Sequence, residues 1–208
     1  MLVLTTYRSS WGQLLHFENL MVLHLLIVGV AASADAWSLD ARWRDRREAG
    51  RTRPHDYSSP LRLCCIVVVV SYLIAGIAKL RYGGMEWVIG DTLRNHVAYS
   101  AARLDLLGGT PSPLAAAAVR RAWMFPPMAA VALVVELVAP IALFGGWYRN
   151  LWVGGAWLMH VGIAALMLVA FPYPLFLAAF APFFPLERVT ALRHVLGRER
   201  HRGPAHVG

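Results

Sequence analysis

Three ionisable side chains lie inside apolar stretches of this sequence: Lys79, Glu136 and His160. Lys79 is the only lysine, and the other long cationic side chains are all arginines. A charge at mid-bilayer costs at least about 2.5–3.5 kcal/mol on insertion scales, so such residues face other protein segments and usually have a function. An apolar pocket disfavours an ammonium group, and a lysine held there can act as a base. We therefore expect these three residues to meet in one cavity.

The neighbours of Lys79 favour an inward orientation. Tyr72, Ala75, Gly76 and Lys79 are spaced i, i+3, i+4 and i+7, so they share one helix face. The side chains on that face are small or polar, which suits packing inside a helix bundle better than contact with lipid. The alternative is a lysine that reaches the membrane boundary beside Arg81, and the spacing alone leaves both interpretations open.

Glu136 and His160 each lie midway along an apolar stretch, where the membrane boundary cannot explain them. Pro140 follows Glu136 by one turn, where it frees a backbone carbonyl and can kink the helix. Ala156 and Ala164 flank His160 at i±4 and predict a close-packed face around the imidazole. The alternatives are a structural ion pair for Glu136 and a satisfied core histidine for His160.

The composition indicates lipid as the solvent for these elements. Hydrophobic residues make up 58% of the 208-residue chain and charged residues only 15%, against about 25% charged in soluble domains. A transmembrane helix needs about 20 mostly apolar residues. We predict an all-α integral membrane protein, a bundle of four to five transmembrane helices. Its expected crossings are residues 14–37, 61–80, 126–146 and 151–171, with the proline-rich 172–185 as a broken fifth crossing or a re-entrant piece.

Two segments between the crossings are too polar to span. Residues 81–113 predict a surface or interfacial amphipathic helix, and residues 114–124 a short amphipathic helix. We expect one transmembrane domain over residues 1–186. Residues 187–208 form a basic tail, which we expect to be disordered.

Arginine placement predicts the orientation in the cell membrane. Six arginines lie in residues 38–60 and five in the tail, so both segments should be cytoplasmic and the N-terminus outside. Lys79 then lies near the outer boundary. The net charge of +8 would indicate nucleic acid in a soluble protein, but no nucleic-acid module is visible and we expect no such partner. Cys64 and Cys65 are adjacent, and no Cys/His cluster has metal-ligand spacing, so we expect no metal.

Several motifs of this sequence together resemble the motifs of one known family. The stretch "YLIAGIAKL", followed by Trp87 and Gly90, resembles the signature of the vitamin K-dependent γ-glutamyl carboxylase family and of the wider HTTM (horizontally transferred transmembrane) proteins that share its membrane core. "AWSLD" at 36–40, "ELVAPIALF" and "MHVGIAALM…FPYPLF" resemble further family motifs in the same order. The resemblance covers about residues 14–186.

The resemblance implies a chemistry and a set of roles. Lys79 matches the proposed base that takes a proton from vitamin K hydroquinone or menaquinol, with Glu136 and His160 orienting or tuning it. In that family oxygen then adds to the reduced quinone, and the strong base that forms drives carboxylation of a glutamate side chain. Tyr72, Gly76 and Trp87 would bind the quinone; all six site residues are assigned on this basis.

The sequence also departs from the carboxylases. Asp35 stands where they carry a functional histidine, and about 20 residues follow the last apolar stretch where they have a large extracytoplasmic domain. We therefore expect a substrate other than a peptidyl glutamate. The alternatives are a non-catalytic membrane subunit, a DoxX-like redox-linked binding protein, or a remnant of the family with structural roles alone. Expected partners are the lipid bilayer, a quinone, and a protein, peptide or membrane partner.

Overall fold

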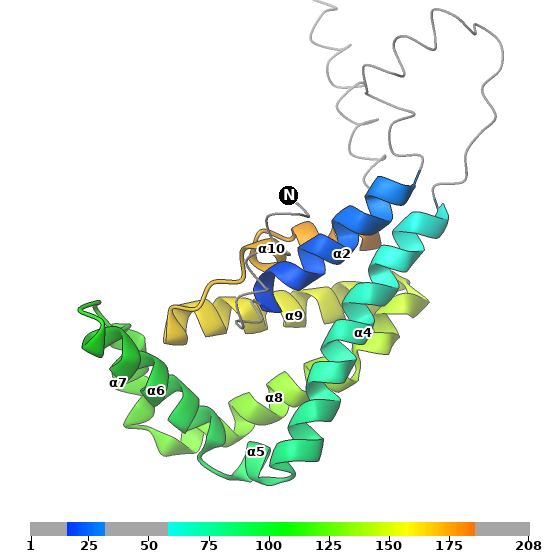
Figure 1. The fold of residues 1–208 in the computed structure, drawn as a ribbon. Coiled ribbons are helices and arrows are strands. Elements are labelled where there is room, and N and C mark those ends of the chain that lie inside the picture. The colour runs from blue at the N-terminus through cyan, green and yellow to red at the C-terminus, as the bar shows by residue number, and fades with distance from the viewer. Residues whose placement is uncertain (1–15, 32–57, 186–208) are drawn as a thin grey trace, which may run out of the picture.

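The computed structural model describes residues 16–31 and 58–185, and within these ranges all regular structure is helical (Figure 1). The prediction of a helical protein is confirmed. The elements are α2 (His16–Val30), α4 (Ser58–Gly83), α5 (Glu86–Ile89), α6 (Thr92–Leu106), α7 (Pro113–Val119), η2 (Ala122–Met124), α8 (Phe125–Leu137), η3 (Ala139–Phe144), α9 (Gly146–Met167), α10 (Pro172–Leu175) and η4 (Ala178–Phe183).

Two helices in the described ranges are long and apolar enough to cross a membrane, α4 and α9. A third candidate consists of α7 followed by the continuous segment of η2 and α8. The chain bends by 97° at the break between α7 and η2. The helix α2 is apolar but shorter. By length and composition, the described residues therefore contain two to three candidate membrane-spanning helices, against the four to five crossings predicted.

Helix α4 is the centre of the fold and packs against α2, α8, η3 and η4 (Figure 1). Its 26 residues extend for about 39 Å at 1.5 Å per residue, more than the ~30 Å of a bilayer core. Val68, Val69 and Tyr72 are buried, whereas Ile66 and Ile74 are exposed. The burial pattern therefore separates a buried face of α4 from an exposed apolar face.

The predicted third crossing is not one continuous helix. It starts with Pro126 and Pro127 in the first turn of α8, as expected, but α8 ends at Leu137 and the 3-10 helix η3 follows. Pro140 lies in η3 and cannot donate a hydrogen bond to the carbonyl of Glu136, so the α-helix cannot continue through it. The interruption at Pro140 is thus a change from α-helix to 3-10 helix, and the predicted crossing 126–146 consists of α8 and η3.

The segment between α4 and α8 is a set of short helices on one side of the fold (Figure 1). Gly84 takes a positive φ of 56° after α4, and this turn leads into α5. Helix α6 buries Val97 against Ala115, Ala118 and Phe125. Its arginines are half-buried or exposed. The predicted interfacial helix over 81–113 corresponds to α5 and α6, and the helix predicted at 114–124 is α7, which starts and ends earlier.

The proline-rich segment after α9 folds back onto the core. Leu168 has a φ of 52° and ends α9, after which α10 and η4 follow. Phe180 and Phe183 are buried against Trp152 and the α4 residues Val68 and Val69. The segment is broken into short helices, as predicted, and it packs inside the protein.

Several predicted features lie outside the described residues or side chains. They include the motif at 36–40 with Asp35, the arginine-rich segment 38–57 and the tail from residue 187. Of the first predicted crossing, 14–37, the structure describes α2 and Ala31.

Candidate functional site

The predicted face of α4 is turned toward α8 and α9. Tyr72 and Gly76 on this face are buried. A Cβ atom placed on Gly76 would lie 3.0 Å from Cβ of Glu136 and 3.0 Å from Cδ2 of Leu137. Carbon atoms in good contact lie about 3.5–4.0 Å apart, so only glycine allows α4 and α8 to come this close. This approach places Glu136 beside the next turn of α4.

Lys79 and Glu136 form an ion pair in this contact. The ammonium group of Lys79 donates a hydrogen bond to Oε1 of Glu136. The side chain of Glu136 is 6% exposed and that of Lys79 is 23% exposed. The second carboxylate oxygen, Oε2, is buried and has no hydrogen-bond partner among the described residues. An acceptor in an apolar environment is costly to leave unpaired, so Oε2 is the first sign of a ligand-binding position.

Trp87 closes the other side of Lys79. The ammonium nitrogen lies 5.1 Å from the centroid of the indole ring, within the range of a cation–π interaction. The ring also contacts His96, with 5.7 Å between centroids. The Nε1–H group of Trp87 is buried and has no acceptor within residues 16–31 and 58–185. Around one cation the structure therefore gathers an unused acceptor, an unused donor and an aromatic face.

His160 pairs with Tyr72 and not with Lys79 or Glu136. The hydroxyl of Tyr72 lies 2.7 Å from Nε2 of His160, and both side chains are buried. If the tyrosine donates this hydrogen bond, Nδ1 of the imidazole carries a proton without an acceptor. In the other tautomer, Nδ1 is an acceptor without a donor. In either case Nδ1 has no partner in the part of the chain that the structure describes.

The single cavity expected for the three ionisable residues is therefore resolved into two pairs. Lys79–Glu136 and Tyr72–His160 lie two turns apart along the same face of α4, with Gly76 between them. All four residues were predicted as site residues. The described part of the chain contains no hydrogen bond that joins the two pairs directly.

Sequence reasoning missed Trp152. Its Nε1–H donates a hydrogen bond of 2.9 Å to the carbonyl of Val135, which is freed because α8 ends at Leu137. The indole also packs edge-on against Tyr72, at 5.1 Å between centroids. Trp152 thus fixes α9 to α8 next to Glu136. Its spacing of eight residues from His160 puts both on one face of α9 and was the available signal.

A second polar cluster joins α2 to the core. His24 is buried, and its Nε2–H donates to the carbonyl of Cys64 over 3.1 Å. The hydroxyl of Tyr173 lies 2.7 Å from Nδ1, so in the neutral ring Nδ1 accepts its proton. Both ring nitrogens are satisfied, and this cluster acts as a structural connection. Among the described residues, no group of three His, Cys, Asp or Glu residues could hold a metal ion.

Comparison with known proteins does not identify the chain. A scan against protein-family models found no matching family, and searches of curated proteins and of solved structures found no match.

Proposed function

We propose that the chain is a multi-pass membrane protein of the HTTM and carboxylase-like kind, in which Lys79 acts as a base on a hydroxyl group of a reduced quinone. The observation that carries this proposal is the Lys79–Glu136 ion pair, which lies between two apolar helices and leaves one carboxylate oxygen unpaired. Such a pair in an apolar segment indicates a functional site.

The pair can take up a proton without leaving an isolated charge in the apolar interior. A proton of the ammonium group can pass to Oε1 of Glu136 along the hydrogen bond that joins them, which leaves two neutral groups. The amine of Lys79 can then accept a proton from a ligand hydroxyl. The pair ends with a charged Lys79 and a neutral Glu136, and its net charge of +1 balances the negative charge that the ligand acquires.

The surroundings of the pair fit a quinone. A quinone has polar oxygens at opposite ends of a flat apolar ring. Oε2 of Glu136 can accept from a hydroxyl, and Nε1–H of Trp87 can donate to an oxygen, because both atoms are buried without partners. Bound reduced quinone would supply an acidic hydroxyl and two electrons. The part of Lys79, Glu136 and Trp87 is to hold the ring and to take up the proton.

A bundle of four to five crossings, with the N-terminus outside and the tail cytoplasmic, belongs to the same proposal. The end of η4 lies beside the first turn of α9, since the guanidinium of Arg149 lies 5.1 Å from the Phe184 ring. This arrangement supports a return of the chain to the side where α9 begins. Lys79 lies in the last turns of α4, far from Ser58 and from the arginine-rich segment that precedes it.

The experiment that tests the base is the Lys79→Arg substitution. Arginine keeps the positive charge but does not give up its proton. In proteoliposomes supplied with reduced menaquinone and oxygen, we expect quinone-dependent oxygen uptake to fall by about 10²–10⁴-fold, the usual contribution of a general base. Arg81→Gln is the matched control, because Arg81 lies two residues away and makes no ion pair with a described residue. Full activity in Lys79→Arg would remove the base role.

A second candidate is a non-catalytic membrane subunit or a DoxX-like binding protein. The ion pair favours this structural role because it connects α4 to α8 directly. Replacing both partners with apolar residues, Lys79→Met with Glu136→Leu, keeps the contact and removes the chemistry. If the double variant retains every quinone-dependent property and any stably bound partner protein, the structural role is correct.

A further inference from the structure

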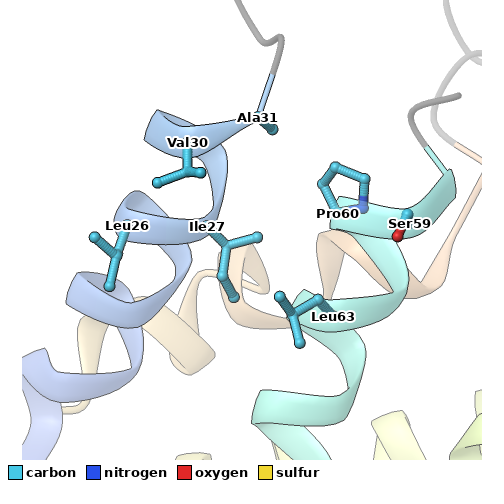
Figure 2. Close-up of a pocket in the computed structure, with 7 residues that line it drawn as sticks. All are labelled: Leu26, Ile27, Val30, Ala31, Ser59, Pro60 and Leu63. Carbon is cyan, nitrogen blue, oxygen red and sulfur yellow. The ribbon is translucent and has the colours of Figure 1, made fainter. Parts of the chain in front are cut away.

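An apolar groove separates the last turns of α2 from the first turns of α4. Its volume is about 510 Å³, and Figure 2 shows Ile27 and Leu63 lying between the two helices. Nearly all of its lining is apolar. The lining residues are Leu26, Ile27, Val30, Ala31, Ser59, Pro60 and Leu63.

The groove exists because α2 and α4 are joined by a hydrogen bond at His24 but are not in close contact nearer the end of α2. The hydrogen bond from His24 to the carbonyl of Cys64 holds α2 against α4. One turn beyond it, the lining of α4 consists of Leu63, Pro60 and Ser59, and the last two are too small to fill the space. The helices therefore stay apart at this end while their contact below remains closed.

A cationic side chain lies beside the groove at the end of a membrane-spanning helix. Arg62 follows the lining residue Ser59 by three residues, so the two are neighbours on the surface of α4 at the edge of the groove. It is exposed and makes no ion pair with any residue in the described ranges. Because α4 begins at Ser58, this level corresponds to the boundary between hydrocarbon and headgroups.

We propose that this groove binds an anionic phospholipid, with an acyl chain between α2 and α4 and the phosphate paired with Arg62. The apolar walls match an acyl chain. A guanidinium group binds a phosphate through two parallel hydrogen bonds, which gives arginine its preference for this partner. Basic positions between transmembrane helices on the cytoplasmic side are where anionic headgroups bind. The proposal does not involve the Lys79 site, but it rests on the membrane orientation proposed above, in which this end of α4 is cytoplasmic.

The test measures how much phosphatidylglycerol stays bound to the full chain. Protein is reconstituted in equal parts of phosphatidylcholine and phosphatidylglycerol, extracted into a neutral detergent, and its retained lipids are quantified by mass spectrometry. Leu63→Trp fills the groove, and Leu61→Trp is its matched control, since both leucines are 48% exposed but only Leu63 lines the groove. Arg62→Gln removes the charge, and Arg103→Gln removes an exposed arginine elsewhere.

We expect Leu63→Trp to abolish selective retention of phosphatidylglycerol and both controls to retain it. Arg62→Gln should lower it by about fivefold, the equivalent of about 1 kcal/mol for one basic residue near anionic lipid. Equal retention by Leu63→Trp and the wild type, equal loss in Leu61→Trp, or no preference over phosphatidylcholine in the wild type would each overturn the proposal. If the wild type retains no lipid, another occupant fills the groove and the proposal is wrong. Circular dichroism and thermal unfolding show whether each variant is folded.

Discussion

Gly76 is the residue on which the contact between α4 and α8 depends. In Gly76→Ala the new methyl group would lie 3.0 Å from Glu136 Cβ, 3.0 Å from Leu137 Cδ2 and 3.1 Å from Leu137 Cγ. Contacts of about 3.5–4.0 Å are favourable, so α8 has to move away by at least about 0.5 Å. Overpacking of this kind costs about 1–3 kcal/mol, offset by about 1 kcal/mol of helix propensity gained from alanine.

We therefore expect Gly76→Ala to lower the free energy of unfolding by about 0–2 kcal/mol and to lengthen the Lys79–Glu136 hydrogen bond. Gly154→Ala on α9 is the matched control, since no atom lies within 4 Å of its added Cβ. It should be neutral or slightly stabilising. The assay is unfolding by a denaturing detergent, followed by circular dichroism. A second substitution, Leu137→Ala, removes two of the three crowding atoms and should recover part of the loss.

The reasoning would be refuted if Gly76→Ala stabilised the protein as much as Gly154→Ala does. It would also be refuted if Leu137→Ala added its own full cost with no coupling to position 76. Residues in direct contact usually show coupling energies of about 0.5–3 kcal/mol in a double-mutant cycle. A coupling near zero would mean that α4 and α8 do not meet at this point.

Other predictions follow from the hydrogen bonds and from the proposed topology. Trp152→Phe leaves the carbonyl of Val135 without its partner and should cost about 1–3 kcal/mol of stability, measured by the same unfolding assay. Tyr72→Phe leaves its imidazole partner unpaired on a second nitrogen and should cost a similar amount. In a background without native cysteines, Asp105→Cys should react with an impermeant thiol reagent from outside intact cells, and Asp45→Cys should not.

Each of these three predictions would be contradicted by a specific result. Stability within about 0.5 kcal/mol of the wild type, as for a typical surface substitution, would mean that the corresponding buried hydrogen bond is not formed. Labelling of position 45 but not 105 would reverse the proposed orientation.

Much of the site could be predicted from the α4 sequence alone. The i, i+3, i+4, i+7 spacing from Tyr72 to Lys79 is a local property of a helix, so the shared face could be predicted directly, whereas the spacing alone left its inward orientation open. The separation of charged from apolar segments likewise predicted that α4 and α9 are helices long and apolar enough to cross a membrane.

The pairing of residues from different helices could not be predicted in the same way. Which residue of α8 lies opposite Lys79 depends on how the two helices slide against each other, and that is fixed by the contact of Gly76 with Glu136 and Leu137. The partner of His160 depends similarly on where Trp152 finds an acceptor. That acceptor exists only because α8 ends before Pro140. These are tertiary constraints, and no single segment contains them.

The most direct test of the central claim is the quinone content of the purified protein. The wild type and Lys79→Ala are each purified from the same membranes in the same detergent. Mass spectrometry of the extracted lipids then compares the amount of menaquinone bound to each protein. If the Lys79–Glu136 pair forms part of a quinone site, the wild type should carry menaquinone at a fixed ratio to protein, and Lys79→Ala should carry none. Equal quinone content in both, or none in the wild type, would contradict it.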